Sequence, residues 1–153
     1  MVQAVFAVDV PGMIHWQDLY FASFPLSSTE GVSPTVIPDG RVFISQQLPN
    51  YASPSLFPQQ PGTVHVLWNG KKVEDLWDRI YYARSDDGGE TWSTAVPVSR
   101  DDAWPDGFPD VVATGEMVHV VFQQEMSGTD NDVYYSRKLP FVSQFILVMK
   151  DYQ

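Results

Sequence analysis

The sequence predicts an all-β fold in which about three units of four antiparallel strands follow one another along the chain. Two observations indicate this fold. Short segments rich in β-branched and aromatic residues recur at a nearly constant spacing. In addition, 12 Pro and 10 Gly are spread along the 153 residues rather than clustered, which is typical of many short elements joined by turns. Convincing helical periodicity is absent.

The repeat is clearest in two pairs of segments, each of which we expect to be a strand. Residues 64–68, VHVLW, recur as residues 118–122, VHVVF, at an offset of 54. Residues 80–84, IYYAR, recur as residues 133–137, VYYSR, at an offset of 53. Because the matches keep both their order and their spacing, they predict two equivalent units of the chain.

A weaker third copy lies upstream of these two. There, residues 5–8, VFAV, take the place of the VHVL strand, and residues 19–23, LYFAS, take the place of the IYYAR strand. A further, outer strand in two of the units is predicted at residues 35–45 and 94–99. Each of these segments contains a proline, which an edge strand tolerates because one side of it needs no N–H donor.

These units describe the blades of a β-propeller. Apolar residues occupy both parities of the strands, so both faces of each sheet are expected to be covered. Units of about 50 residues with four strands buried on both faces are typical of propeller blades. We therefore expect one propeller-type domain over residues 1–153, with blade-like units at about 1–49, 50–101 and 102–153. A two-sheet sandwich that happens to repeat is the alternative.

The stretch SDDGGETW, residues 85–92, connects two of the expected strands, and each of its residues has a reason to be in a turn. Aspartate accepts hydrogen bonds from backbone N–H groups, glycine adopts positive φ, a threonine hydroxyl can bond the local backbone, and tryptophan can fold inward. A calcium loop, with ligands at alternate positions over about twelve residues and a closing glutamate, is not present.

The same stretch matches the motif Ser-x-Asp-x-Gly-x-Thr-Trp of the Asp box, or BNR repeat, at Ser85, Asp87, Gly89, Thr91 and Trp92. The chain therefore resembles the sialidase-type β-propeller family, well over residues 51–137 and loosely over residues 1–50. The resemblance implies that the box is a folding element on the face opposite the ligand site.

If the box marks one face, the loops of the other face are expected to carry the ligand site. These loops collect aromatic residues beside carboxylates, a combination that suits sugar rings, because C–H surfaces stack on aromatic faces and carboxylates accept hydroxyl protons. The alternative is that the tryptophans pack between blades. The predicted ligand-binding residues are Trp104, Asp106, Asp102, Trp77, Tyr51 and Trp16.

No catalytic residue is carried over from the family. Sialidases hold the substrate carboxylate with three arginines, and the Arg-Ile-Pro signature of the first is missing from this chain. We therefore expect a non-catalytic module that binds a glycan or a similar polar ligand. Two alternatives stay open: a glycoside hydrolase whose site is assembled from two chains and uses acids such as Asp102 and Asp106, and a structural or protein-interaction repeat.

Charge and composition exclude several function classes. The net charge of −10 leaves no basic face for nucleic acid or for an anionic membrane surface. There is no cysteine and no metal-ligand spacing, so neither a disulfide nor a metal or other cofactor is expected. His65 and His119 occupy equivalent mid-strand places and are expected to be core histidines bonded to a neighbouring blade. The N-terminal segment is a poor signal peptide, and the compartment is left open.

Three blades are too few to close a ring, since closed propellers use four to eight. The preferred solution is a homodimer that closes six blades. In it, a strand within Phe141–Met149 is expected to pair with the first unit of the partner. A fragment of a longer protein and irregular end caps are the alternatives.

Overall fold

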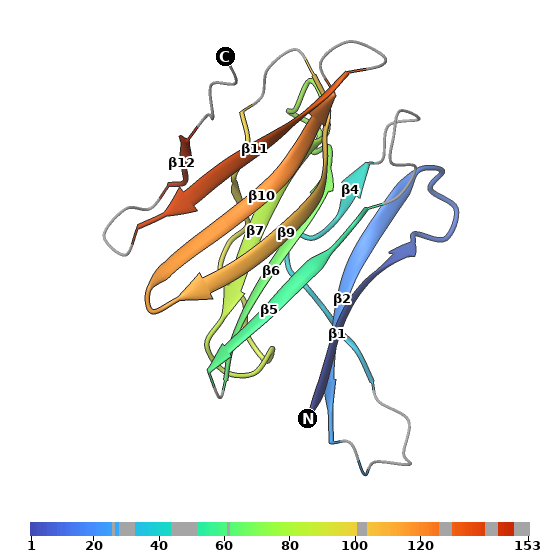
Figure 1. Ribbon diagram of the computed structural model, residues 1–153. Coiled ribbons are helices and arrows are strands. Elements are labelled where there is room, and N and C mark those ends of the chain that lie inside the picture. The colour runs from blue at the N-terminus through green and yellow to red at the C-terminus, as the bar shows by residue number, and fades with distance from the viewer. Residues whose placement is uncertain are drawn as a thin grey trace.

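The computed structural model describes residues 1–25, 27, 33–43, 52–60, 62–100, 104–125, 130–139 and 144–148. Throughout this part of the chain the regular structure is β-strand, arranged in three antiparallel four-stranded sheets (Figure 1). The prediction of an all-β chain with four-stranded antiparallel sheets is confirmed. Within the same residues, no helix has the length and hydrophobicity needed to cross a membrane.

Each sheet is formed from one continuous stretch of the chain. Sheet A contains β1 (Val2–Asp9), β2 (Trp16–Phe24), β3 (Thr35–Val36) and β4 (Val42–Phe43), and β2 pairs with each of the other three. Sheet B contains β5 (Ser55–Gln60), β6 (Thr63–Gly70), β7 (Arg79–Ser85) and β8 (Val96–Pro97). Sheet C contains β9 (Asp106–Thr114), β10 (Met117–Glu125), β11 (Asn131–Lys138) and β12 (Ile146–Val148). The strands of sheets B and C pair in sequence order, as expected for two equivalent units.

The strand register confirms that the segments of sheets B and C are equivalent. Leu67 of β6 pairs with Tyr82 of β7, and Val121 of β10 pairs with Tyr135 of β11. An aliphatic side chain therefore meets a tyrosine at equivalent positions across the two central strands of each sheet, and such cross-strand pairs stabilise a sheet.

In sheet A, the alignment expected from the sequence is wrong by three residues. Val5 of β1 pairs with Phe21 of β2, and Phe21 stands where Tyr82 stands in sheet B. Val5 therefore takes the place of Leu67 and not that of Val64. The error arises because the first strand fits the repeat at more than one alignment, and only its pairing with the neighbouring strand fixes the register.

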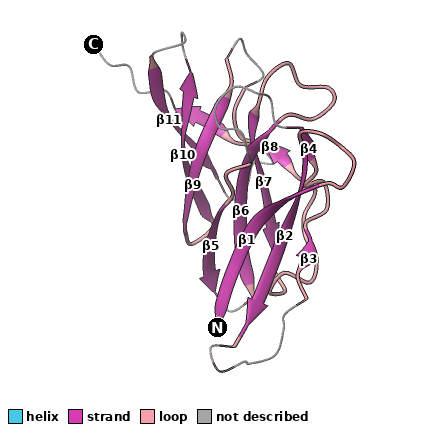
Figure 2. Cartoon of the chain, turned by 90° about the vertical axis from the view of Figure 1, so that its right-hand side faces the viewer, coloured by secondary structure: helices cyan, strands magenta, loops and turns pink. Residues whose placement is uncertain are grey.

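Sheet B lies between sheets A and C, and its two faces pack against them (Figures 1 and 2). We call the face of sheet B that packs on sheet A its back face, and the face that packs on sheet C its forward face. The equivalent faces of sheets A and C take the same names. The back face of sheet B, with Val66 and Trp68, packs on Leu19 of sheet A. Its forward face, with Leu67, packs on Val120 of sheet C. Both faces of β6 are buried, as the sequence predicts.

In the single chain, each of the two flanking sheets is covered on one face only, so the expectation that both faces are covered is met there by sheet B alone. On the forward face of sheet C, Val121 is 43% exposed and Val133 is 65% exposed. On the back face of sheet A, Phe6 is 37% exposed. The middle sheet alone, among the sheets that the structure describes, has a neighbour on each side. Apolar residues at both parities therefore leave one exposed apolar face on each flanking sheet.

The last strand also differs from the expectation. β12 does form within Phe141–Met149, but it pairs with β11 of its own sheet through Ser136 and Leu147. It is therefore the fourth strand of sheet C and not a strand added to a partner chain. The short connection from β11 to β12 favours this local pairing, because closing a short loop has a small entropic cost.

Candidate functional site

The loops of the molecule gather at two opposite ends of the sheets. One end holds the turn at residues 86–92, after β7, together with the turns that join β5 to β6 and β9 to β10. The other end, at the top of Figure 1, holds the β1–β2 loop, the β6–β7 loop and the start of β9 (Figure 1). We call the first the turn end and the second the loop end.

The turn after β7 is organised by the side chain of Asp87. Its carboxylate accepts hydrogen bonds from the backbone N–H of Thr91 at 2.8 Å, from the Thr91 hydroxyl, and from Ser85 Oγ at 2.8 Å. Ser85 Oγ in turn accepts the backbone N–H of Gly89 at 2.8 Å. Asp87 therefore binds backbone N–H groups as the sequence predicts, whereas the Thr91 hydroxyl bonds a carboxylate and not the backbone.

The same turn joins sheet B to sheet A. The Trp92 ring meets the ring of Phe21 of β2 edge-on, with the ring centres 5.3 Å apart. Trp92 Nε1 donates to the carbonyl of Gly89 at 3.2 Å, and the Thr35 hydroxyl donates to the same carbonyl at 3.4 Å. Trp92 thus folds inward as expected, and the turn contributes to packing between sheets.

The hydrogen bonds of Asp87 give a prediction for acid unfolding. The Thr91 hydroxyl, then the Thr91 N–H and Ser85, lower the pKa of Asp87 to about 2. In the unfolded chain this pKa is about 4, so the stabilisation is fully present above about pH 5 and is lost as the pH falls from about 4 to about 2. We expect Asp87→Asn to lower the free energy of unfolding most above pH 5. The difference in this free energy between the variant and the parent protein, measured by urea unfolding, should shrink toward pH 2. Glu90→Gln, which removes one charge from the same turn, is the control; a difference for Asp87→Asn that does not change with pH would contradict this account.

At the loop end, the β6–β7 loop is held in one shape by Asp75. Its carboxylate accepts hydrogen bonds from the Lys72 backbone N–H at 2.8 Å and from the Tyr81 hydroxyl, and it forms an ion pair with Arg79 at 3.4 Å. Burial, with the hydrogen bond to Asp75, raises the pKa of Tyr81. The Lys72 ammonium lies 4.7 Å from the centre of the Tyr81 ring. The network fixes the loop, and no spacing in the sequence identifies Asp75 as its centre.

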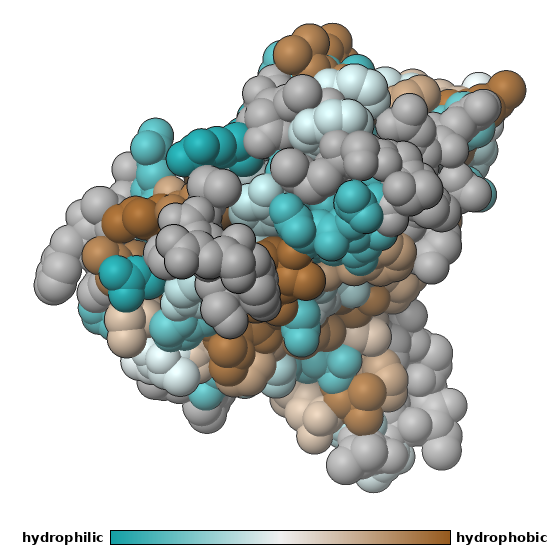
Figure 3. All heavy atoms as spheres, turned by 45° about the horizontal axis from the view of Figure 1, so that its top comes forward, coloured by the Kyte–Doolittle hydropathy of each residue, from teal (hydrophilic) through white to brown (hydrophobic). Residues whose placement is uncertain are grey.

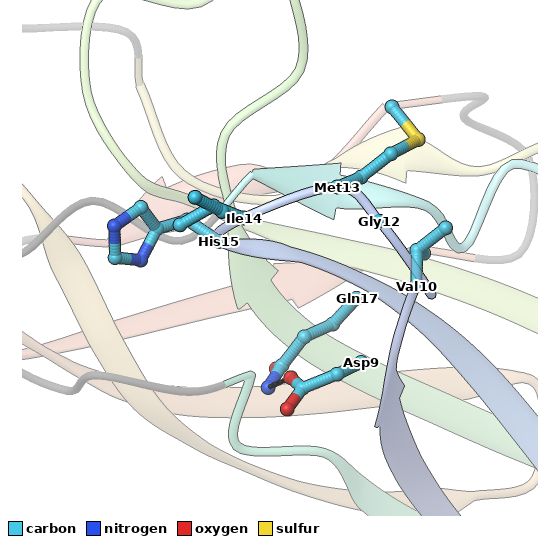
Figure 4. Close-up of a pocket in the computed structure, with 7 residues that line it drawn as sticks. All are labelled: Asp9, Val10, Gly12, Met13, Ile14, His15 and Gln17. Atoms are coloured by element: carbon cyan, nitrogen blue, oxygen red, sulfur yellow. Dashed lines mark hydrogen bonds between the residues drawn. The ribbon is translucent and has the colours of Figure 1, made fainter.

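An open pocket of about 660 Å³ lies at the same end, in the loop between β1 and β2 (Figure 4). Its polar lining includes Asp9 and Gln17, and the side-chain amide of Gln17 donates to the Asp9 carboxylate at 2.8 Å. The amide oxygen of Gln17 also accepts the backbone N–H of Ala52 at 2.9 Å, so Gln17 is fixed from both sides. The lining residues are Asp9, Val10, Gly12, Met13, Ile14, His15 and Gln17.

The pocket presents apolar surface beside this polar pair. Ile14 is 80% exposed and Met13 is 41% exposed. His15, at φ 65°, lies in the left-handed region, and Figure 4 shows its ring directed away from the Asp9–Gln17 pair. Figure 3, with the top of Figure 1 brought forward, shows hydrophobic and hydrophilic residues side by side on the molecule. The sequence predicts Trp16 at this end, but no motif or spacing in it indicates a role for Asp9 or Gln17.

A second hollow of about 550 Å³ lies between sheets B and C near β8 and β12. Its lining includes Arg79 and Arg100, together with apolar residues such as Phe145. Arg79 is already engaged, because it donates to the carbonyl of Ser99 at 2.7 Å as well as pairing with Asp75.

The predicted ligand-binding residues that the structure describes are spread over the loop end. Trp104, just before β9, is 38% exposed. Trp77 lies half-buried in the β6–β7 loop, and Trp16 is half-buried at the start of β2 with its ring edge-on to Phe43 at 5.7 Å. Tyr51 and Asp102 lie outside the described residues.

Asp106 is placed below the surface and supports the start of β9. It is 1% exposed, accepts a hydrogen bond from Gln124 at 3.0 Å, and its backbone N–H donates to the carbonyl of Asp78 at 2.8 Å. Asp78 is also fully buried, as is Asn69 near the end of β6, which accepts the backbone N–H of Ser53 at 2.6 Å. The ends of β6, β7 and β9 therefore share a buried polar layer beneath the loop end.

No group of three or more potential metal ligands occurs among the described residues. No protein-family model matches the chain, and no curated protein matches it significantly.

Proposed function

We propose that this chain is a non-catalytic, propeller-type module that binds a glycan or a similar polar ligand at its loop end. The observation that carries the proposal is the β1–β2 pocket, in which a fixed carboxylate stands beside exposed apolar side chains. A carboxylate accepts hydroxyl protons, and apolar surface covers the C–H face of a sugar ring. The pocket volume of about 660 Å³ lies in the range that small-molecule sites occupy, about 300–1,000 Å³.

Two further observations support the blade-like part of the proposal. The three sheets pack face to face in chain order, with sheet B in the middle. The turn that resembles an Asp box lies at the end opposite the pocket, which is the arrangement that the resemblance to sialidase-type propellers implies.

The pocket favours binding over glycoside hydrolysis. Hydrolysis requires two carboxyl groups about 5–10 Å apart on either side of the glycosidic bond. Among the described residues that line the pocket, Asp9 is the only carboxylate.

The proposal is tested on a glycan array, followed by titration calorimetry with each glycan that binds. We expect Asp9→Asn to weaken binding about tenfold or more, because a charged hydrogen bond is worth about 1.5–3 kcal/mol. Glu74→Gln, on the exposed part of the β6–β7 loop, removes the same charge outside the pocket and is expected to bind like the parent protein.

Each other outcome contradicts the proposal in a specific way. Hydrolysis of fluorogenic sialosides or glycosides would show an enzyme. If no glycan binds on the array and no substrate is hydrolysed, a structural or protein-interaction repeat would be favoured. Equal weakening by Asp9→Asn and Glu74→Gln would place the ligand elsewhere.

A further inference from the structure

The three sheets repeat the same aromatic pair on their back faces. The pairs are Phe6–Tyr20 in sheet A, Trp68–Tyr81 in sheet B and Phe122–Tyr134 in sheet C, and each pair is stacked, with ring centres 5.9, 6.1 and 5.7 Å apart. In sheets B and C the first ring of the pair is buried, because the preceding sheet covers it: Trp68 is 0% exposed and Phe122 is 3% exposed. In sheet A the corresponding ring of Phe6 is 37% exposed.

The forward faces of sheets B and C repeat a histidine–tyrosine pair. His65 Nδ1 lies 2.8 Å from the Tyr82 hydroxyl, and His119 Nδ1 lies 2.7 Å from the Tyr135 hydroxyl. Sheet C covers the first pair: His65 is 1% exposed, and Phe145 meets the Tyr82 ring edge-on at 5.2 Å. The second pair is on the outer face of sheet C and is only half-buried.

The residues around the second pair are apolar and exposed, whereas their counterparts in sheet B are buried. Leu67 and Ile80 of sheet B are 0% exposed against sheet C. Their counterparts in sheet C, Val121 and Val133, are 43% and 65% exposed. Val112 and Met117 extend the same apolar face, at 44% and 37% exposed. Apolar patches of this kind mark interaction surfaces.

One chain therefore carries two exposed faces of complementary type, a forward face on sheet C and a back face on sheet A. Within the chain, a forward face always packs on a back face, as sheet A does on sheet B and sheet B on sheet C. The two exposed faces lie on opposite sides of sheet B, so a single chain cannot bring them together (Figure 1).

We infer that the partner of these faces is a second copy of this chain, and that the forward face of each sheet C packs on the back face of the other copy's sheet A. Two such contacts, related by a twofold axis, close a ring of six sheets with no exposed face left over. The inference rests on the blade-like packing in the proposed function, and it names the partner and the residues through which that partner is bound. β12 has no part in this contact, because it completes its own sheet.

The first test is the molar mass of the protein in solution, measured by light scattering. We expect twice the chain mass of 17.3 kDa. Because the faces are apolar and each chain carries a net charge of −10, the dimer should persist when the salt concentration is raised to about 1 M. A monomer, or an assembly of more than two chains, would overturn the inference.

Val133→Glu tests the forward face. Since Val133 is 65% exposed in the single chain, a glutamate there leaves the fold intact but places a charge in the proposed contact. We expect a monomer with the circular dichroism spectrum of the parent protein, and a melting temperature that no longer rises with protein concentration. Val73→Glu introduces the same charge at an 86% exposed site in the β6–β7 loop and should stay dimeric. A dimer that survives Val133→Glu would overturn the inference.

Cross-linking tests which faces meet. The chain has no cysteine, so Phe6→Cys and Val121→Cys each introduce a single reactive thiol. A short bis-maleimide should link the two chains when both substitutions are present, or when the two single variants are mixed. Linkage of either single variant to itself would show that like faces meet, and would overturn the arrangement.

The glycan array keeps this inference separate from the proposed function. If the protein is a dimer but binds no glycan, the proposed function is wrong and the inferred contact is unaffected. If the parent protein is a monomer that binds a glycan, the inferred contact is wrong and the proposed function is unaffected.

Discussion

Lowering the pH from 7 to 4 is expected to reduce the free energy of unfolding by about 3 kcal/mol through His65 alone. His65 is 1% exposed in the core between sheets B and C, and burial, with a smaller contribution from Arg84, lowers its pKa to about 4. Asp86 acts in the opposite direction. The unfolded chain binds a proton near pH 6.5, whereas the folded chain does so only near pH 4. The stability due to neutral His65 is therefore fully present above about pH 6.5 and is lost as the pH falls through about 4.

The contacts of His65 explain why it stays neutral. Gln59 Oε1, which can only accept, lies 2.8 Å from Nε2, so Nε2 carries the proton. Nδ1 then accepts from the Tyr82 hydroxyl at 2.8 Å. A second proton on the ring would remove that acceptor inside the core. Both partners belong to sheet B, so the expectation of a histidine bonded to a neighbouring blade is wrong for His65.

Urea unfolding at pH 7, 6, 5 and 4 measures this effect. In His65→Gln we expect the fall between pH 6.5 and pH 4 to shrink by about 3 kcal/mol relative to the parent protein. His119→Gln is the matched control, because His119 makes the same tyrosine contact on the outer face of sheet C and its removal should leave the fall due to His65 in place. An identical pH dependence in His65→Gln and the parent protein would refute the assignment.

Gly89→Ala is expected to lower the free energy of unfolding by about 2–5 kcal/mol, a large part of the stability of an ordinary domain. A Cβ atom on Gly89 would lie 2.1 Å from Cε1 and 2.3 Å from Cδ1 of the Phe21 ring, which is itself buried at 2% exposed. The backbone of Gly89 has φ +99°, a conformation that L side chains rarely adopt. The overlap should contribute about 1–3 kcal/mol and the backbone strain about 1–2 kcal/mol.

The neighbouring glycine separates the two contributions. Gly88 has φ +78°, but a Cβ there would meet nothing within 4 Å. Gly88→Ala should therefore lower the free energy of unfolding by about 1–2 kcal/mol, through backbone strain alone. Equal losses for the two substitutions, measured by urea unfolding of both variants, would mean that the turn does not pack on Phe21 as described.

Several features of the fold follow from local sequence. β-Branched and aromatic segments at a spacing of about 54 residues predict the strands β6, β7, β10 and β11, and the structure confirms each of them. The composition of SDDGGETW predicts a turn with positive φ at Gly88 and Gly89, which both adopt. Strand pairing and turn geometry depend on residues close together in the chain, so their signals survive in the sequence.

The candidate site was only partly predictable. Trp77 and Trp104 lie between strands at the loop end, as the sequence predicts, whereas Trp16 is the first residue of β2. Asp9 and Gln17 were not identified, because Asp9 belongs to the apolar first strand and Gln17 becomes fixed only through the distant backbone of Ala52. The sequence does not predict the burial of Asp106, since this burial depends on Gln124 from the next strand and on Asp78 from the β6–β7 loop.

The sequence by itself determined the strands, the turns and the four-stranded repeat of this protein, because these depend on period-two patterning and on the backbone preferences of Gly, Asp and β-branched residues. The tertiary structure alone decided the register of β1, the pairing of β12 with its own sheet, and which apolar faces are buried. Val66 and Val121 have the same kind of side chain in the same kind of strand. One is buried and the other is 43% exposed, because burial depends on whether another sheet lies against that face.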